Sequence, residues 1–97
     1  MLTDLQKQNQ ILRRLRIKKA KSIKTHTKQE WLCMLKEFPY CVKCKKTNII
    51  LYKDHIIPIY QTERNPSDSI ENIQPLCKSC NSSKSGDSTN YIKIIKN

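Results

Sequence analysis

Two Cys-x-x-Cys pairs constrain this 97-residue chain more than any other feature of its sequence. The first pair is Cys41-Val42-Lys43-Cys44, the second is Cys77-Lys78-Ser79-Cys80, and 32 residues separate them. Each pair can turn two sulfur atoms towards one point, so both together supply the four thiolates of a tetrahedral Zn²⁺ site. Disulfides or a redox site are the alternative, which the wide gap disfavours. A closed four-sulfur shell leaves no position for water, so we predict a structural zinc.

The composition also favours a structural metal. Only 37% of the residues are apolar and 6% are aromatic, so a chain of this length is one domain with a limited core. No apolar run approaches the roughly 18 residues of a membrane span, and the N-terminus lacks the apolar stretch of a secretory signal. We therefore expect an intracellular protein without a membrane partner, whose paired cysteines are thiolate ligands and not disulfides.

The net charge of +11 is concentrated at the N-terminus. Residues 1–28 contain nine lysines and arginines against Asp4 alone. Such a basic segment indicates a polyanionic partner, because neutralising phosphates is its usual role. A solubilising surface is the alternative that charge alone leaves open. We expect residues 1–26 to form a basic N-terminal helix or arm.

Two capping boxes predict where the first helices begin. Thr3-Asp4-Leu5-Gln6 starts an amphipathic helix that reaches about Lys19, with an apolar face that could pack on the body or on a partner. Thr27-Lys28-Gln29-Glu30 repeats the signature before a second helix. Trp31 is expected to anchor this helix in the core and Cys33 to be a buried packing residue.

The central region predicts two short strands and a short helix. Ile49–Tyr52 has strand character and would deliver Asp54-His55 at its end. Ile73–Leu76 is expected to return as the second strand, although Pro75 weakens that prediction. Lys78–Ser85 is expected to be a helix that starts at the second cysteine pair, whereas the last eight residues have no clear pattern.

Several residues between and beside the cysteine pairs can carry chemistry. Asp54 and His55 are adjacent, Asn72 follows, and Asn81 comes directly after the fourth cysteine. Hydrolysis of a phosphodiester needs a base to activate water and a cation to offset charge, which imidazole and an oxygen-bound metal ion can supply. His26 lies in a polar segment between the two predicted helices, and we interpret it as an ordinary surface or core histidine.

This pattern resembles the HNH endonuclease family, the ββα-metal nucleases, in its zinc-containing branch. The resemblance covers about residues 40–85, and its elements are Cys41-x-x-Cys44, Asp54-His55-Ile56-Ile57-Pro58, Asn72 and Leu76-Cys77-x-x-Cys80-Asn81-x-x-Lys84. It implies an α+β fold, namely a small ββα-metal fold stapled by a four-cysteine zinc site, with one or two N-terminal helices. Residues 27–97 would then be the HNH nuclease domain.

The resemblance also assigns roles to individual residues. His55 would be the general base, and Asp54 and Asn81 would hold one catalytic Mg²⁺ or Mn²⁺. Asn72 would hydrogen-bond within the loop that carries His55 and fix its orientation. Apart from the resemblance, Lys84 lies three residues after Asn81 and so on the same face of a helix, where it could contact the substrate phosphate; a solvated lysine fits the sequence equally well.

We therefore predict a metal-dependent endonuclease that cuts DNA, expected to be double-stranded, and leaves 5′-phosphate and 3′-hydroxyl ends as the family does. A chain this small has little surface for recognising a long site, so a homodimer or a larger nuclease or packaging complex is a reasonable expectation. A non-catalytic, zinc-stabilised nucleic-acid-binding module is the alternative, but it gives no reason for Asp54, His55, Asn72 and Asn81 to occur together. A zinc knuckle for protein contacts fits the charge poorly.

Overall fold

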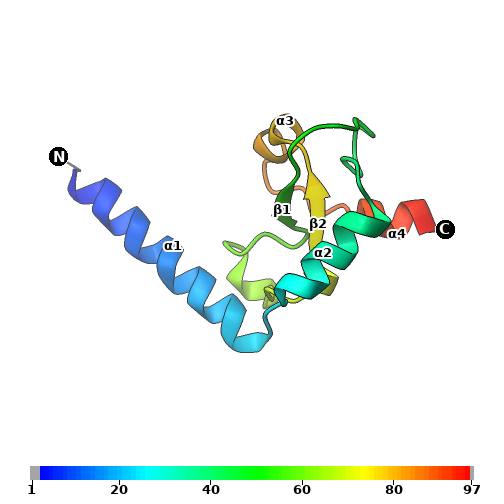
Figure 1. The fold of residues 1–97 in the computed structure, drawn as a ribbon. Coiled ribbons are helices and arrows are strands. Elements are labelled where there is room, and N and C mark those ends of the chain that lie inside the picture. Colours follow the sequence, from blue (N-terminus) through cyan, green and yellow to red (C-terminus); the bar gives the residue numbers. More distant parts are fainter. Residues whose placement is uncertain (1–2, 97) are drawn as a thin grey trace.

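The computed structural model describes residues 3–96, in which a two-stranded antiparallel sheet is combined with helices (Figure 1). In chain order the elements are α1 (Asp4–Ile23), α2 (Lys28–Glu37), β1 (Tyr52–His55), the 3₁₀ turns η1 (Thr62–Arg64) and η2 (Ile70–Asn72), β2 (Ile73–Leu76), α3 (Lys78–Ser82) and α4 (Tyr91–Lys96). The α+β class and the β1–β2–α3 order confirm the predicted architecture.

Both predicted capping boxes are present at the starts of α1 and α2. The hydroxyl of Thr3 accepts from the Gln6 amide at 3.1 Å, and the Gln6 side chain accepts from the Thr3 amide at 2.9 Å. Thr27 and Glu30 repeat both bonds at the same distances. Each box satisfies amides that the first helical turn would otherwise leave unpaired. Helix α1 continues to Ile23, further than the sequence pattern predicted.

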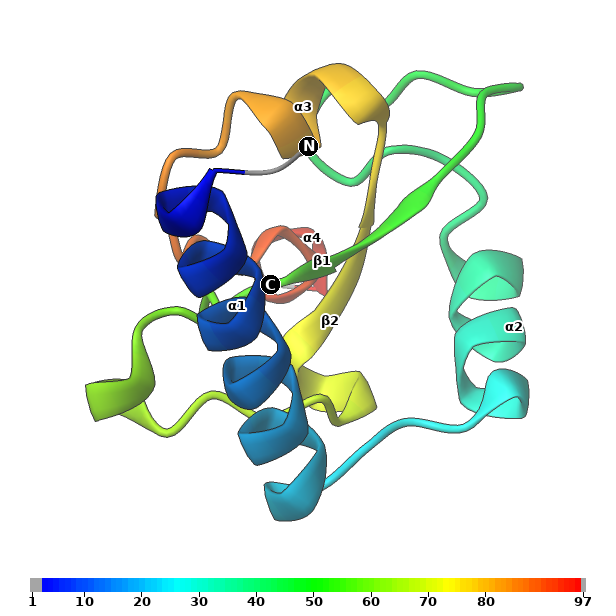
Figure 2. The same ribbon diagram turned by 90° about the vertical axis from the view of Figure 1, so that its left-hand side faces the viewer.

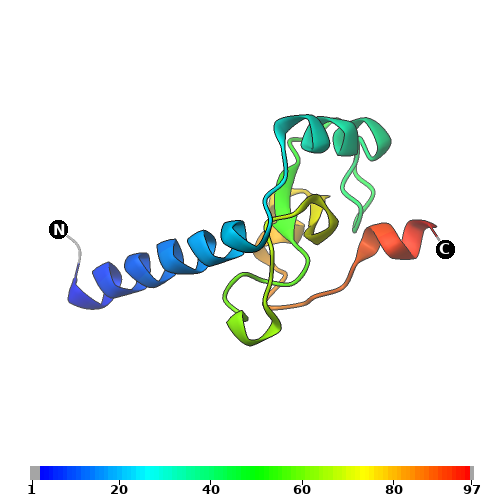
Figure 3. The same ribbon diagram turned by 90° about the horizontal axis from the view of Figure 1, so that it is seen from below.

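Helix α1 is attached to the body near its C-terminal end. It crosses in front of the sheet in Figure 2, while its N-terminal end points away from the body in Figure 3. Ala20 is 2% exposed, whereas the larger apolar side chains towards the other end are 47 to 66% exposed: Leu5, Ile11, Leu12 and Leu15. The body therefore leaves the apolar face of α1 uncovered from Leu5 to Leu15 and covers it at Ala20. Within residues 3–96, none of the helices combines the length and apolar character needed to cross a bilayer.

The adjacent residues Asp54 and His55 lie inside β1, which is part of the sheet. β1 pairs with β2 so that Asp54 lies opposite Gln74 and His55 lies opposite Ile73. The observed strand, Tyr52–His55, begins where the predicted strand, Ile49–Tyr52, ends, so the prediction was placed too far towards the N-terminus. Its apolar run is not a buried strand, because Ile50 is 74% exposed. Pairing with the buried β2 determines where β1 lies.

The second strand is confirmed despite its proline. All four residues of β2 are buried, and the carbonyl oxygen of Pro75 accepts from the Val42 amide at 3.2 Å. Both strands of a two-stranded sheet are edge strands, where the missing N–H of proline is tolerated. This bond also joins the first cysteine loop to β2.

The core lies around the cysteines and not along α2. It consists of Phe38, Cys41, Val42, Leu76, Cys77 and Cys80. Helix α2 has no fully buried residue and contacts the core through Met34 and its C-cap, Phe38. Trp31 is only partly buried, with the Lys53 ammonium 5.6 Å from its ring centre, and Cys33 is exposed. The predictions of a tryptophan core anchor and a buried Cys33 are therefore wrong.

The segment after the second cysteine pair also differs from its prediction. Helix α3 ends at Ser82 and not at Ser85, because the chain turns at Ser85 (φ 46°) and Gly86 (φ 84°). Lys84 consequently lies outside the helix. The C-terminal residues that showed no pattern form α4, whose Tyr91, Ile92 and Ile95 pack against the core.

Candidate active site

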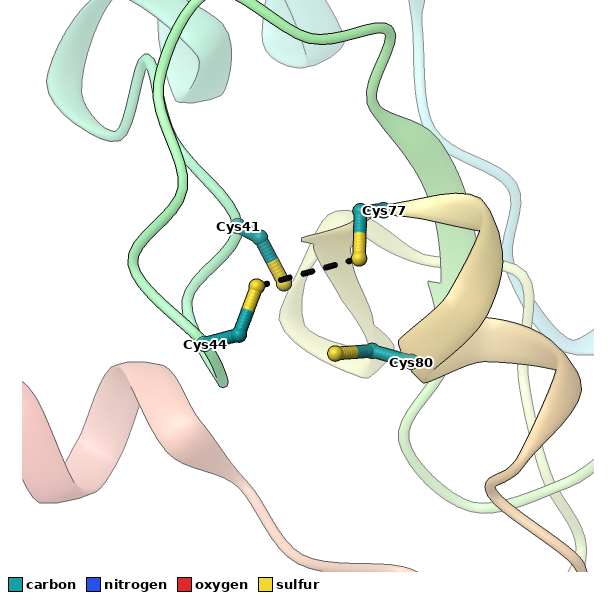
Figure 4. A group of neighbouring side chains, drawn as sticks. All are labelled: Cys41, Cys44, Cys77 and Cys80. Carbon is teal, nitrogen blue, oxygen red and sulfur yellow. Dashed lines mark hydrogen bonds between the residues drawn. The ribbon is translucent and has the colours of Figure 1, made fainter.

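The four paired cysteines converge on one point (Figure 4). Their sulfur atoms all lie within 4.8 Å of one another, and the Sγ atoms of Cys44 and Cys77 are 3.8 Å apart. A tetrahedral site with Zn–S bonds of about 2.3 Å has edges of about 3.8 Å. The donor set and the spacing therefore fit a four-coordinate Zn²⁺, as the sequence predicted.

Local backbone geometry turns each pair towards that point. In the first loop the Lys45 amide donates to the carbonyl oxygen of Cys41 at 2.7 Å, and Lys45 has a φ of 67°. The Cys41 amide donates to the carbonyl oxygen of Lys46 at 3.1 Å. In the second pair Cys77 is the N-cap of α3 and Cys80 lies on its first turn. A loop and a helix start thus hold the sulfurs from opposite sides.

The thiols of this cluster do not ionise alike. Although burial opposes its ionisation, backbone hydrogen bonds from Cys44, Cys77 and Lys43 lower the pKa of Cys41 to about 6. Burial, together with hydrogen bonds to the other thiols, raises the pKa of Cys80 to about 12. Cys41 therefore ionises readily, whereas ionisation of Cys80 needs a cation to offset its charge. Zinc binding should therefore release protons and weaken as the pH falls.

A cleft of about 470 Å³ brings four of the predicted site residues together. Asp54 and His55 from β1, Asn81 from α3 and the following Lys84 all line it. Arg13 and Arg16 of α1 and Lys53 of β1 also line this cleft. The carboxylate, the imidazole and the amide thus share one basic cavity.

Asp54 is buried but has charged and polar partners. Its carboxylate oxygens accept from the Lys84 ammonium at 3.0 and 2.8 Å, and Oδ2 also accepts from the Gln74 side chain at 2.9 Å. A carboxylate has about four lone-pair positions, so these three bonds leave one free, on Oδ1. Asp54 can therefore give a cation one oxygen ligand without losing an existing bond. An Asn81 amide oxygen is a suitable second ligand for Mg²⁺ or Mn²⁺.

Lys84 points into the protein and not towards solvent. Besides Asp54, its ammonium contacts the backbone carbonyl oxygens of His55 and Ile56, the second at 3.1 Å. Its side chain is 11% exposed. This lysine therefore stabilises the strand end that carries Asp54 and His55, a role that neither sequence interpretation included.

Asn72 is buried beneath the loop that follows His55. Its side-chain oxygen accepts from the Ile57 amide at 2.8 Å, and its side-chain nitrogen donates to the carbonyl oxygens of Ile57 and Ser67 at 3.2 and 2.8 Å. Its own carbonyl oxygen accepts from the Ile56 amide at 2.8 Å. Asn72 does not line the cleft that contains His55 and Asn81.

Sequence reasoning missed two buried residues that contact the site. Asp68 Oδ1 lies 2.8 Å from His55 Nε2, and Gln74 bonds Asp54 while also donating to the carbonyl oxygen of Thr89 at 3.1 Å. Gln74 Oε1 accepts from the Tyr91 amide at 3.0 Å. Strand alternation could have indicated Gln74, which lies opposite Asp54. Asp68 lies in a loop without periodicity, so no local pattern identified it.

The ionised form of Asp68 is favoured in the folded protein. Although burial acts against it, hydrogen bonds from Thr25 and His55 and the nearby imidazoles of His26 and His55 hold the pKa of Asp68 below its usual value. A carboxyl group with a lowered folded-state pKa stabilises the fold above its unfolded pKa of about 3.9. That contribution is lost as the pH falls through the lowered value.

Residues 41–87 match the family model described as HNH endonuclease. This segment of the chain belongs to the HNH endonuclease family. The HNH segment contains all four clustered cysteines and the two strands, and it begins at the first cysteine. A nuclease-type function and a nucleic-acid substrate follow at the level of the family. No curated protein and no solved structure matches the chain.

Removing zinc should unfold the HNH domain. We expect a strong chelator, or Cys80→Ser, to abolish the cooperative thermal transition, because structural zinc contributes about 10 kcal/mol or more to small domains. Circular dichroism melting with a zinc assay measures this effect. Cys33→Ser is the matched control, since Cys33 is exposed outside the cluster, and should keep both zinc and transition. An unchanged transition in Cys80→Ser would contradict a structural zinc.

Lys84→Met should destabilise the zinc-loaded protein by about 3 kcal/mol, because it leaves the buried Asp54 carboxylate without its counter-charge. Urea unfolding gives the free-energy difference. Lys93→Met, at an exposed lysine of α4, is the control and should cost less than about 0.5 kcal/mol. Equal losses in the two variants would show that the ion pair contributes nothing to the fold.

Proposed function

We propose that this protein is a metal-dependent endonuclease that hydrolyses phosphodiester bonds in double-stranded DNA. The observation that carries the proposal is the basic cleft in which Asp54, His55 and Asn81 meet. A nuclease-type family supports the reaction class. The proposed products are 5′-phosphate and 3′-hydroxyl ends.

His55 is proposed to act as the general base. A neutral imidazole can take a proton from water as that water attacks phosphorus, and a positioned base contributes roughly 10²- to 10⁴-fold to rate. The His55 side chain is 26% exposed and lines the cleft, so water and substrate can reach it. Asn72 supports the following loop through its bonds to Ile57.

Asp54 and Asn81 are proposed to hold one Mg²⁺ or Mn²⁺ at the cleft. When bound, such an ion offsets negative charge on the phosphate oxygens. With one free lone pair on Asp54 and one amide oxygen, the protein supplies few ligands. Binding of the ion should therefore depend on the substrate phosphate, because hard cations complete their shells with phosphate and water oxygens. Lys84 keeps Asp54 in place and, as an alternative role, could contact phosphate.

The N-terminal arm is proposed to bind the DNA backbone. We divide the chain into this arm, residues 1–26, and the HNH domain, residues 27–97. Arg13 and Arg16 of α1 line the cleft with Lys53, so a phosphate near the catalytic residues would meet positive charge from both parts. Backbone contacts of this type give affinity that is largely independent of sequence and falls with salt. Recognition of a longer site would need a homodimer or a larger nuclease or packaging complex.

Plasmid cleavage with Mg²⁺ or Mn²⁺ tests the function. We expect the wild-type protein to cleave and His55→Ala to lose at least about 100-fold in rate, while keeping its zinc and its DNA affinity, because only the base is removed. Equal cleavage by both proteins would eliminate His55 as the base. If the wild-type protein fails to cleave the plasmid with either Mg²⁺ or Mn²⁺, the non-catalytic nucleic-acid-binding module becomes the better description.

Two double variants that remove the same charge test whether DNA affinity depends on where the arm charges lie or only on how many there are. We expect the double variant Arg13→Gln/Arg16→Gln to bind duplex DNA more weakly and to reduce the slope of log affinity against log salt by up to about 1.8, because each phosphate contact contributes about 0.9. Lys7→Gln/Arg14→Gln removes the same charge from α1 residues that do not line the cleft and should have a smaller effect. Titrations at several salt concentrations measure both. Equal effects would show that only net charge matters.

A further inference from the structure

The geometry points to Asp68 as a positioning residue for His55: it accepts the Nε2–H of the ring and so leaves Nδ1 as the basic nitrogen. This inference rests on the proposed function, in which His55 is the general base. The segment that joins α1 to α2 then affects catalysis as well, because Lys24, Thr25 and His26 of this segment hold Asp68.

The contact between Asp68 and His55 lies at the edge of the cleft. Nε2 of His55 and Oδ1 of Asp68 are 2.8 Å apart, and their side chains are 26% and 9% exposed. His55 lines both the cleft with Asp54 and a neighbouring groove that contains Asp68. The imidazole therefore lies between a buried carboxylate and the space proposed for the substrate. A carboxylate placed in this way restricts rotation of the ring.

Asp68 is held from the other side by the segment that joins α1 to α2. The Thr25 hydroxyl donates to Asp68 Oδ2 at 2.6 Å, and the Asp68 amide donates to the carbonyl oxygen of Lys24 at 2.9 Å. The His26 amide and Nδ1 each lie 2.8 Å from the carbonyl oxygen of Asp68. These contacts fix both the backbone and the carboxylate of Asp68. His26, which we interpreted as an ordinary histidine, is part of this junction.

The hydrogen bond to Asp68 determines which ring nitrogen of His55 carries the proton. An ionised carboxylate is only an acceptor, so His55 Nε2 must donate to Asp68. In the neutral ring the proton then resides on Nε2, and the lone pair resides on Nδ1. Within residues 3–96, no hydrogen-bond partner occupies Nδ1 of His55. The nitrogen that can accept a proton from water is thus the one that the protein leaves free.

The test uses the 97-residue, zinc-loaded protein and the variant Asp68→Asn, whose amide can offer a donor to Nε2. We expect kcat for plasmid cleavage to fall roughly 10- to 100-fold with KM nearly unchanged, because the wrong tautomer becomes populated. Nitrogen chemical shifts of the labelled His55 ring should report the Nε2–H tautomer in the wild type and a mixture in the variant. Glu71→Gln is the matched control, since this nearby carboxylate is exposed and forms its ion pair with the exposed Lys24 and not with His55. It should change neither measurement.

Thr25→Val provides a milder variant if Asp68→Asn fails to fold. It removes only the hydroxyl donor to Oδ2, so a smaller fall in kcat is expected, and Thr25→Ser should restore the rate. An Nδ1–H tautomer in the wild type, or an unchanged kcat in Asp68→Asn, would overturn the inference. If the wild-type protein cleaves no DNA while Asp68→Asn alters the tautomer, the proposed nuclease activity fails but the positioning of His55 by Asp68 stands.

Discussion

The convergence of four thiols is the constraint on which the rest of the structure depends. It joins a loop that begins at Cys41 to a helix that begins after Cys77, although these segments are far apart in the sequence. The buried Leu76 immediately precedes Cys77, so fixing that cysteine also fixes β2. The register between β2 and β1 then determines where Asp54 and His55 lie. The four-cysteine cluster, which fits a structural zinc, thus determines the geometry of the residues proposed to perform hydrolysis.

Two buried aspartates near the cleft have different partners. Asp54 is paired with the ammonium group of Lys84, whereas Asp68 is bonded to the Thr25 hydroxyl and to the imidazole of His55. Burying a carboxylate is costly unless it is paired, and each of these groups has its partners. The pairing with Lys84 holds the oxygen atoms of the proposed cation ligand, and the pairing with His55 orients the proposed base. Their environments therefore suit one for binding a cation and the other for aligning a proton acceptor.

The sequence predicted the features that depend on local chemistry. The two capping boxes, the thiol cluster and the strand at Ile73–Leu76 occur as expected. Short-range spacing defines each capping box and each Cys-x-x-Cys turn, and the preference of Zn²⁺ for four thiolates predicts that the two turns meet. The first strand was misplaced because Ile49 and Ile50 have strand-like side chains but lie exposed. Burial of this kind depends on tertiary pairing, which an apolar run does not reveal.

The site was predictable only in part for the same reason. Asp54, His55 and Asn81 were identified from their order along the chain, and the structure brings them to one cleft. Asp68 could not be identified, because its bond to His55 spans 13 residues and ends in an irregular loop. The inward direction of Lys84 depends on where α3 ends, which the sequence placed three residues too late. Long-range hydrogen bonds therefore carry the information that motifs omit.

The amide of Gln74 has a consequence for the smallest fragment that can fold. This fully buried side chain joins Asp54 to Thr89 and Tyr91, which lie beyond the end of the family match at residue 87. A fragment that ends at residue 87 would leave the Gln74 side chain without these two partners, at a cost of about 1 to 3 kcal/mol for each buried polar group that stays unsatisfied. The buried hydrogen-bond network around Asp54 thus extends past residue 87 to the first residue of α4.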